Sequence, residues 1–574
     1  MSMQAVKIGL WCNRNAAEYH WKHGQNIFQL YIEEILSHAG IPYRLFDQAE
    51  QLSAYRPDII VNVLAGERDE DLDRLLRWAE DGAVVIAYGG LNRLASRMGC
   101  VEVGCREAVY AEIEGMEAVL QGKLLRALCS QPWKLLAGHE QAASPLAEAQ
   151  GKLRLGKAGS ELGAASLTFR IGTGKLIRWN VDIPGTVVYL QQGRGPIYQD
   201  GIPAEDGTGG IDEGILKADD GMEVDWKEDR VKTDSNIPYF PVPYGDLWRE
   251  VIVHELMKEA EGLGLALPFL DYWPSGTEQV ALISHDSDFN SEEAAITTIE
   301  LLKECGVRST WCMIEPGYSR EMYEMITDAG HELAFHFNAL EAEGGIWSQD
   351  EFSRQLQHLR QASGADIVSN KNHYTRFEGW GELFRWCEAE GIQADQTRGP
   401  SKKGNVGFPF GTAQPYYPIA WADERNRLYD VLQIGFLTQD LEHPMLPDMS
   451  VIEPFLQAVK GVRGVAHFLF HQQHIHHIEG VRKAFRAVVG QAKSLGYTFW
   501  TCAEITSWEQ ARRNARLSVD ASGALEAGNL PEGAIIRYYQ HPHTDVEEDS
   551  KRDRYGLPCP EWSGMIKGAA ERTR

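Results

Sequence analysis

The sequence predicts an α/β protein in which a distorted (β/α)7–8 barrel follows a flavodoxin-like, doubly wound α/β domain with a β-rich insertion. Three observations predict this fold class. Apolar runs of strand length alternate with helix-length segments from residue 278 onward. Several of these runs end in His or Asp, as strands do at the active end of a barrel. A shorter series of strand and helix patterns fills residues 1–103.

Length, charge and cysteine usage limit the class of partner and the compartment. The chain of 574 residues is too long for a single core, and its formal net charge of −26 argues against nucleic acid or an anionic membrane as partner. No apolar run approaches the roughly 20 residues that span a bilayer. The N-terminus is typical of a first strand, not of a signal peptide, so we expect a cytoplasmic protein. The nine Cys residues form no CxxC pair and are expected to be reduced. Whether the protein forms a homo-oligomer is left open.

The first domain is expected at residues 1–103. Strands are predicted at 6–11, 59–64 and 83–88, and helices at 25–39 and 71–80. This layout resembles the class I glutamine-amidotransferase-like fold. That family carries a nucleophilic Cys at a sharp strand-to-helix turn, where this chain has Tyr88-Gly89-Gly90-Leu91. The resemblance therefore implies a structural or binding domain without amidotransferase chemistry.

Three further segments surround the barrel. Alternating patterns such as Ser166–Ile171 predict a β-rich insertion at 104–199. Residues 200–230 carry eleven acidic and three basic residues, so 200–277 is expected to be a solvated acidic linker with a helix near 244–263. A calcium loop is disfavoured because the acidic residues lack the alternate-position register of such loops. Residues 511–574 are expected to form a tail with short β segments and a loose, charged end.

The barrel is expected at residues 278–510. Its strands are predicted at 280–286, 307–314, 331–337, 366–374, 392–396, 430–437, 464–471 and 497–502. The helices between them are predicted at 292–305, 320–329, 349–362, 380–390, 451–461 and 480–495. A turn-rich segment covers 404–418. Regular βα alternation favours a closed or nearly closed barrel over an open sheet.

Polar side chains end four of these strands. Asp286 and Asp288 stand two residues apart, and a cation would relieve the repulsion between their carboxylates. His336, His373 and His471 end or follow three other strands. Any one of these His residues alone is more simply a hydrogen-bonded core or surface group. Because the carboxyl ends of parallel strands meet at one edge, the set as a whole predicts a metal site there.

The residues of this set resemble the polysaccharide deacetylases, carbohydrate esterase family 4 with the NodB-homology fold, over about 278–508. His285-Asp286-Ser287-Asp288 is similar to the family's first motif, which implies Asp286 as general base and Asp288 as metal ligand. Gly330-His331-Glu332 leads into His336 as in the second motif, which implies a second ligand. The strand that ends in His471 looks like the one that carries the general acid, and residues 500–508 look like the closing strand and helix.

Two positions depart from the family pattern. Leu340 stands where the family has its second ligand His, and the third motif offers Lys371 in place of the Arg that braces the base. The third ligand is therefore open among His373, His471 and His474, and His373 is preferred because it ends a neighbouring strand. The expected cofactor is a divalent metal, Zn²⁺ first, with Co²⁺, Ni²⁺, Mn²⁺ or Fe²⁺ as alternatives.

Substrate contacts are expected from aromatic and His side chains near these strand ends. The candidates are Tyr374, Phe410, Tyr416 and His474. The loop 407–417 interleaves aromatic residues with Gly and Pro, which suits stacking on a sugar ring and equally suits a packed barrel lid.

These observations predict a metal-dependent hydrolase that removes acyl groups from a carbohydrate or small acylated substrate, with Asp286 as base and His471 as acid. Two alternatives stay open. One is a catalytically degenerate carbohydrate-binding or scaffold protein, which the Leu340 substitution favours. The other is a related amide hydrolase, because the same chemistry does not require a sugar.

Overall fold

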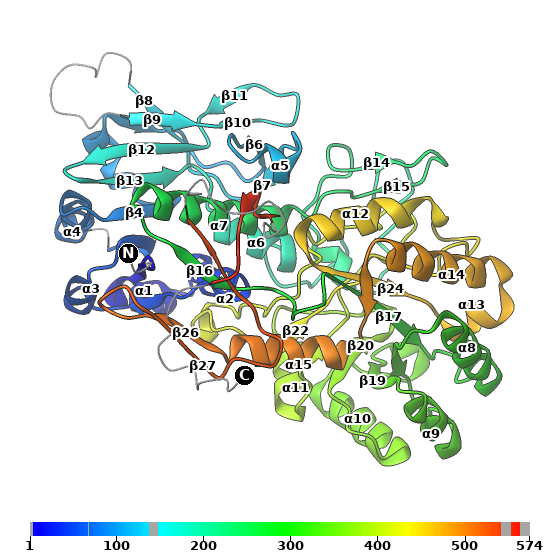
Figure 1. The fold of residues 1–574 in the computed structure, drawn as a ribbon. Coiled ribbons are helices and arrows are strands. Elements are labelled where there is room, and N and C mark those ends of the chain that lie inside the picture. The colour runs from blue at the N-terminus through cyan, green and yellow to red at the C-terminus, as the bar shows by residue number, and fades with distance from the viewer. Residues whose placement is uncertain (1–3, 67, 137–146, 541–552, 563–574) are drawn as a thin grey trace.

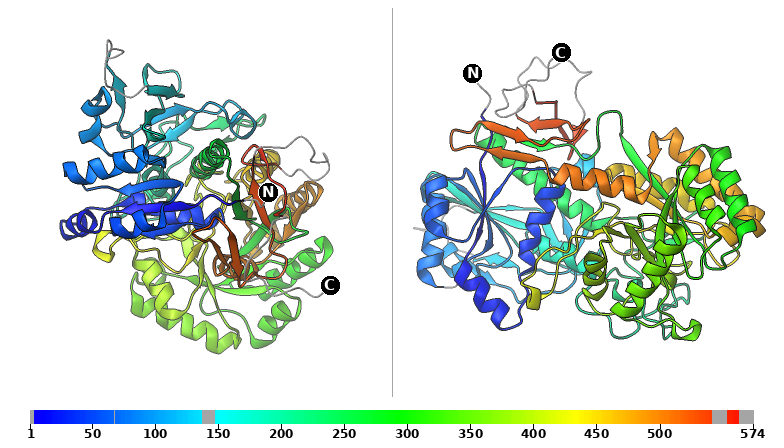
Figure 2. Two further views of the ribbon diagram at one scale, coloured as in Figure 1. Left: turned by 60° about the vertical axis from the view of Figure 1, so that its left-hand side comes forward. Right: turned by 90° about the horizontal axis from the view of Figure 1, so that it is seen from below.

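Two large sheets organise the chain, one in each half of the sequence (Figure 1). The computed structural model describes residues 4–66, 68–136, 147–540 and 553–562. Both views in Figure 2 show the blue-to-cyan N-terminal half beside the green-to-orange second half. Helices α6 (Ile183–Gln192) and α7 (Tyr244–Gly262) lie where the halves meet. Among the described helices, none combines the length and apolar character that a bilayer crossing requires.

The N-terminal sheet has the strand order β2-β1-β3-β4-β13-β12-β9, and its first five strands run parallel. The strands are β1 (Ile8–Cys12), β2 (Arg44–Phe46), β3 (Ile59–Leu64), β4 (Val84–Tyr88), β9 (Ala147–Gln150), β12 (Ser166–Ile171) and β13 (Gly174–Trp179). The helices of this part are α1 (Arg14–Lys22), α2 (Ile32–His38), α3 (Ala49–Tyr55) and α4 (Asp69–Glu80). The flavodoxin-like and amidotransferase-like descriptions of this domain stay predictions.

Strands of the expected insertion at 104–199 complete this sheet. Strand β13 pairs in parallel register with β4, from Lys175 beside Val84 to Trp179 beside Tyr88. The remaining strands of the segment form a smaller sheet of order β11-β10-β6-β7, except β8, which pairs with β5 just before the segment. Their bounds are β5 (Cys100–Glu102), β6 (Val109–Glu112), β7 (Leu125–Ala127), β8 (Trp133–Leu135), β10 (Lys152–Arg154) and β11 (Glu161–Gly163). The boundary expected after residue 103 therefore does not separate two sheets.

The second sheet is parallel throughout and has the order β22-β21-β20-β19-β18-β17-β24-β23, with β25 also beside β17. Its strands are β17 (Gln279–Asp286), β18 (Thr310–Met313), β19 (Glu332–Phe337), β20 (Ser369–Asn372), β21 (Ala394–Asp395), β22 (Leu432–Gln433), β23 (Thr438–Gln439), β24 (Val465–Leu469) and β25 (Tyr497–Phe499). In the described structure the edge strands β22 and β23 are not paired with each other. The sheet is thus a curled half-barrel and not the closed or nearly closed barrel that was expected. Its edge strands β22 and β23 are only two residues long, too short to pair and close the sheet.

Helices cover the outer side of the curled sheet (Figure 1). They are α8 (Glu292–Cys305), α9 (Arg320–Asp328), α10 (Gln349–Ser363), α11 (Glu382–Glu390), α12 (Ile452–Val462), α13 (Gln472–His477), α14 (Glu479–Ser494) and α15 (Cys502–Arg513). Local sequence sets several of their ends. Ser291 and Ser348 cap the N-termini of α8 and α10 by accepting a backbone N–H, and both helices end at a left-handed Gly, Gly306 and Gly364.

The C-terminal segment is anchored by one buried carboxylate. Strand β28 (Ile536–Tyr539) pairs with β16 (Leu267–Leu270), and Asp271 follows β16 directly. Asp271 accepts hydrogen bonds from Arg537 Nε at 2.6 Å and Arg554 Nη2 at 3.2 Å, and it also pairs with Arg463. Three guanidinium groups therefore depend on one side chain that is 3% exposed. The described part of the expected tail is fixed to the barrel; residues 541–552 and 563–574 lie outside the described residues.

The acidic segment expected to be a solvated linker lies on the half-barrel instead. Residues 197–221, here called the strap, run beside the loop that follows β20. Backbone bonds join Ile197 and Gly379 at 2.8 and 2.9 Å, and Phe377 N donates to Leu216 O at 3.1 Å. Asp219, fully buried, accepts from the backbone N–H of residue 401 at 2.9 Å. Asp219 and Glu213 of the strap thus bind groups of the barrel loop at residues 401 and 402, which corrects the linker expectation.

Candidate metal centre

Strand β17 delivers polar side chains to the carboxyl end of the half-barrel. Ser284 and Asp286 are two residues apart and therefore share one face of the strand. Lys371, on β20, donates from Nζ to Ser284 Oγ at 2.7 Å and to Asp286 Oδ1 at 2.9 Å. All three side chains are buried. His285 faces the other way and bonds a backbone carbonyl at 2.9 Å, so it takes no part in this cluster.

Asp288, His336 and His373 meet around one point. His336 Nε2 lies 3.3 Å from Asp288 Oδ1, and His373 Nδ1 lies 3.5 Å from the same oxygen. The two ring nitrogens are 3.3 Å apart. His336 is the last residue but one of β19, and His373 follows β20, the neighbouring strand. The structure thus brings together the three residues that the sequence predicts as metal ligands; their role stays a prediction.

In both His336 and His373, one ring nitrogen contacts an oxygen atom on the side away from Asp288, and the other ring nitrogen faces Asp288. His336 Nδ1 lies 2.8 Å from the carbonyl oxygen of Lys371, so the proton is on Nδ1 and Nε2 is free to act as a ligand. His373 Nε2 lies 3.3 Å from a carboxylate oxygen of Glu343, which leaves Nδ1 free in the same way. In the described part of the chain, the buried Oδ1 of Asp288 has no hydrogen-bond donor. Three electron-pair donors therefore converge.

A divalent cation fits this arrangement. Zn–N and Zn–O bonds of about 2.0–2.1 Å with tetrahedral angles place neighbouring ligand atoms roughly 3.3–3.4 Å apart. The three separations observed here are 3.3, 3.3 and 3.5 Å. Two imidazoles and one carboxylate suit Zn²⁺ and related first-row ions. Asp288, His336 and His373 are accordingly a candidate metal centre.

A second cluster of Asp and His stands on the opposite wall. Asp440, which follows β23, accepts from the backbone N–H of His471 at 2.7 Å and pairs with the Nδ1 atom of the same residue. His474 Nδ1 lies 2.9 Å from Asp440 Oδ2. These three residues could also hold an ion by proximity. However, both oxygens of the Asp440 carboxylate already have donors, so we assign Asp440 the task of orienting His471.

His471 faces the two carboxylates of β17. Its Nε2 atom lies 3.5 Å from Asp288 Oδ2 and 3.9 Å from Asp286 Oδ2. Burial opposes protonation, but the carboxylates of Asp440, Asp288 and Asp286 outweigh it and raise the pKa of His471 to about 10. Burial would raise the pKa of Asp286, whereas the ammonium group of Lys371 and the nearby imidazoles hold it below its ordinary value. At neutral pH the site thus pairs a charged carboxylate with a protonated imidazole.

The cluster opens into a cavity of about 270 Å³. Barrel residues and the strap both line it: Glu213, Lys217, Asp286, Asp288, His373, Tyr374, Thr375, Ser401, Lys402, Gln439, Leu469 and His471. Tyr374 is the one substrate-contact candidate from the sequence that reaches this cavity. Phe410 and Tyr416 are 5% and 1% exposed and belong to the core, where Tyr416 OH donates to a backbone carbonyl at 3.2 Å. Of the two alternatives for the loop 407–417, the structure therefore favours packing, and Phe410 and Tyr416 do not line the cavity as substrate contacts. His474 contacts Asp440 and does not line this cavity either.

Several residues of the site were not predicted. Asp440 follows β23, which begins directly after the strand predicted at 430–437, so the strand-end rule contained a usable signal for it. Lys217 and Glu213 reach the cavity from outside the half-barrel, and no local pattern marks them. Leu340 is buried at the end of the loop after β19 and supplies no ligand atom; His373 provides the third donor from the adjacent strand.

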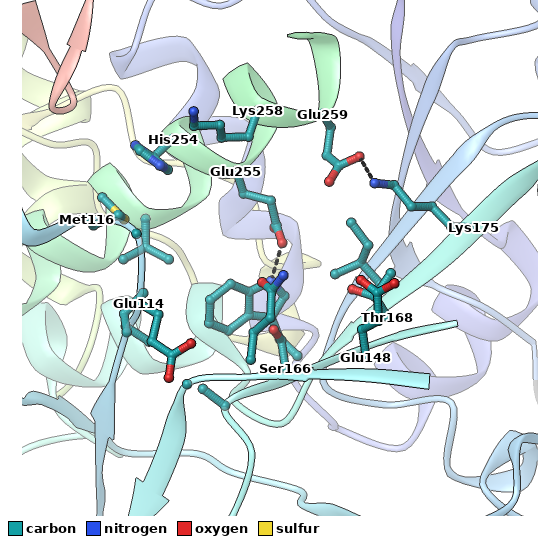
Figure 3. Close-up of a pocket in the computed structure, with 18 residues that line it drawn as sticks. Glu114, Met116, Glu148, Ser166, Thr168, Lys175, His254, Glu255, Lys258 and Glu259 are labelled. Carbon is teal, nitrogen blue, oxygen red and sulfur yellow. Dashed lines mark hydrogen bonds and ion pairs between the residues drawn. The ribbon is translucent and has the colours of Figure 1, made fainter. Parts of the chain in front are cut away.

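A larger cavity lies on the N-terminal sheet and shares no residue with this cluster. It has a volume of about 410 Å³ and lies between β12, β13 and α7 (Figure 3). Glu255 of α7 faces it and accepts hydrogen bonds from Trp179 Nε1 at 2.7 Å and Tyr88 OH at 3.0 Å. Burial raises the pKa of Glu255 to about 8. Lys175 pairs with Glu259 across the opening. These contacts join α7 to the sheet and bring no metal-ligand set together.

Comparisons with known proteins find similarity in structure alone. No family model matches the sequence, and no curated protein matches it. The chain is similar to a candidate polysaccharide deacetylase from Mycobacterium smegmatis (15% identity, TM-score 0.32, 42% of this chain and 94% of that chain). It is also similar to a mutant of BA3943, a CE4 family pseudoenzyme with restored enzymatic activity (15%, 0.24, 41% and 69%), and to Puue allantoinase (12%, 0.31, 41% and 91%). At this level of identity and TM-score, the similarities carry no argument about activity.

Proposed function

We propose that this protein is a metal-dependent hydrolase that removes an acyl group from a carbohydrate or a small acylated compound. The observation that supports the proposal is the convergence of Asp288, His336 and His373 beside a paired Asp286 and an opposing His471. One cavity gives access to both carboxylates, His373 and His471. Zn²⁺ is the expected ion, with Co²⁺, Ni²⁺, Mn²⁺ and Fe²⁺ as alternatives.

When bound, the ion supplies a Lewis acid that polarises the acyl carbonyl and lowers the pKa of water. Asp286 accepts a proton from the attacking water, and Lys371 keeps this carboxylate charged until then. Water adds its oxygen to the acyl carbon, and the bond from that carbon to the sugar oxygen or nitrogen breaks. His471 Nε2 donates the proton that the leaving oxygen or nitrogen needs. Asp440 holds the Nδ1 proton of His471, so Nε2 is the atom that faces the cavity.

Asp286, Lys371 and His471 are therefore the proposed catalytic set, and Asp288, His336 and His373 the proposed ligands. A degenerate protein that binds without catalysis is the alternative that Leu340 favours. The position of His373 supports catalysis instead, because it completes a three-donor set without any contribution from residue 340. A related amide hydrolase would use the same groups, since an amide nitrogen also requires a proton from His471 to leave.

Elemental analysis and product assays test the proposal together. The purified protein is expected to contain about one equivalent of divalent metal per chain, and to release acetate from acetylated sugars or small amides until a chelator is added. Asp288→Ala and His336→Ala should lose the metal, whereas Asp286→Asn should keep it and lose turnover. His358→Ala, on the exposed side of α10, is the matched control and should change neither the metal content nor turnover. Wild-type protein that binds no metal and is unaffected by chelation would contradict the proposal.

A further inference from the structure

Two Lys residues, Lys217 of the strap and Lys402 of a barrel loop, add positive charge to a cavity that also holds Asp286 and Asp288. Lys217 is 3% exposed, and a Lys side chain that is this deeply buried normally has an ion partner. Its Nζ pairs with one carboxylate oxygen of Glu213, and Lys402 pairs with the other. Two ammonium groups therefore share one carboxylate. These three residues together carry a formal net charge of +1, and all three line the cavity that also reaches Asp286 and His471.

Unpartnered hydroxyl groups line the same cavity. Thr375 Oγ1 and Ser401 Oγ are buried, and neither has a hydrogen-bond partner among the described residues. Buried polar atoms are nearly always paired in native proteins, so these two hydroxyls are available to a polar ligand. Tyr374 and Thr375 also adopt left-handed backbone angles, with φ of 55° and 53°. Strained non-glycine residues of this kind cluster at binding sites.

Geometry limits the size of the ligand. The cavity of about 270 Å³ falls below the roughly 300–1,000 Å³ of typical drug-sized sites. The strap lies beside the loop after β20 and contributes to the cavity wall, since Lys217 forms a backbone bridge with Arg376. A single ring or a compact chain suits this space better than an extended polymer.

We propose that the substrate is a small acylated compound that also carries a carboxylate, and that Lys217 and Lys402 bind this carboxylate. The inference rests on the proposed function, because it assigns the non-reacting end of the same substrate. A monoanion matches the net charge of +1 that Lys217, Lys402 and Glu213 carry together, and charge-assisted hydrogen bonds to ammonium groups are stronger than those between neutral groups. Thr375 and Ser401 donate to or accept from the remaining polar groups. Lys217 and Lys402 determine specificity and do not contact the bond that breaks.

A pair of esters that differ at one carbon tests this assignment. Mono-O-acetylglucose and mono-O-acetylglucuronate differ only in the neutral or anionic group at C6. We expect kcat/KM for the glucuronate ester to be about tenfold higher, mainly through a lower KM, and the preference to shrink as salt is added. Lys402→Met should reduce the ratio of the two kcat/KM values to near one. Lys403→Met, at the adjacent exposed Lys outside the cavity, should retain it. Lys217→Met, checked first for folding, should reduce the same ratio in the same way.

Calorimetric binding of unacylated glucuronate and glucose separates this inference from the proposed function. If neither ester is hydrolysed but glucuronate binds selectively, and Lys402→Met alone loses that selectivity, the function fails and the charge assignment stands. If both esters are hydrolysed with equal kcat/KM, the function stands and the inference is overturned. Equal binding of glucose and glucuronate, or a preference that Lys402→Met leaves intact, also overturns it.

Discussion

Replacing Lys371 by Met isolates the buried ion pair on which the proposed base depends. Lys371 is 0% exposed, and its Nζ atom lies 2.9 Å from Asp286 Oδ1 and 2.7 Å from Ser284 Oγ. With an effective dielectric constant of about 20, unit charges at that separation attract each other by roughly 6 kcal/mol. Most of this attraction offsets the cost of removing both ions from water. Removing one partner of such a pair typically lowers the free energy of unfolding by about 3–5 kcal/mol, because the other charge is left buried and unpaired.

We therefore expect the free energy of unfolding of Lys371→Met to fall by about 3–5 kcal/mol in urea titrations at pH 7. Asp286→Asn should cost a similar amount, because it leaves the ammonium group alone. The double variant removes both charges, so its loss should be smaller than the sum of the single losses by about 3 kcal/mol. Single variants within 1 kcal/mol of wild type, or strictly additive losses, would refute the reasoning.

The same substitution should lower activity. Burial raises the pKa of Asp286, and the ammonium group of Lys371 is the strongest of the groups that lower it. Removing this ammonium group should therefore raise the pKa of Asp286. A general base contributes about 10²–10⁴-fold to the rate, so turnover of Lys371→Met at pH 7 is expected to fall at least about 100-fold. The measurement is acetate release by metal-loaded protein at saturating substrate. A variant that keeps full turnover would show that Lys371 is not needed to keep Asp286 charged.

Other perturbations address the ligand set, the C-terminal anchor and the buried carboxyl of α7. His373→Leu should reduce bound metal to below about a tenth of the wild-type content by elemental analysis, since affinity falls steeply when one of three ligands is lost, with His358→Leu as the control. Asp271→Asn should lower the free energy of unfolding by about 3–5 kcal/mol, whereas exposed Asp328→Asn should change it by less than about 0.5 kcal/mol. The pKa of Glu255 is raised from 4.5 unfolded to about 8 folded, so its contribution to stability is largest below pH 4.5 and is lost as pH rises toward 8. Glu255→Gln should therefore gain about 2–4 kcal/mol relative to wild type between pH 5 and pH 8 in unfolding titrations, and an unchanged difference would contradict the raised pKa.

The strand-end residues could be predicted because a physical rule connects sequence to position. In a parallel sheet, residues at the carboxyl ends of adjacent strands lie together whatever connects the strands. To predict Asp286, Asp288 and His336 as site residues, it was enough to recognise an apolar run and the point where it ends. The preference for His373 used the same rule, and β19 and β20 are indeed neighbours. The sheet order thus brings Lys371 into hydrogen-bond contact with Ser284, 87 positions earlier in the chain.

The other features depend on tertiary contacts that local patterns do not encode. Closure of the sheet required edge strands long enough to pair, and β22 and β23 are two residues each. The strap looked like a solvated run of charge, because nothing local shows that the carboxylate of Asp219 accepts hydrogen bonds from residues 401 and 405. An aromatic loop such as 407–417 looks alike whether it faces a ligand or the core, and here Phe410 and Tyr416 face the core.

The two origins of the site residues correspond to two tasks. The groups proposed for metal binding and proton transfer end rigid strands or follow them closely, and their second contacts are mostly buried carbonyl or carboxylate oxygens. The groups proposed for substrate choice come from the strap and from loops, where substitution does not disturb the sheet. Changes at Lys402 should therefore alter which compound is hydrolysed while the metal content stays the same. Changes at His336 should remove the metal and with it the turnover of every substrate alike.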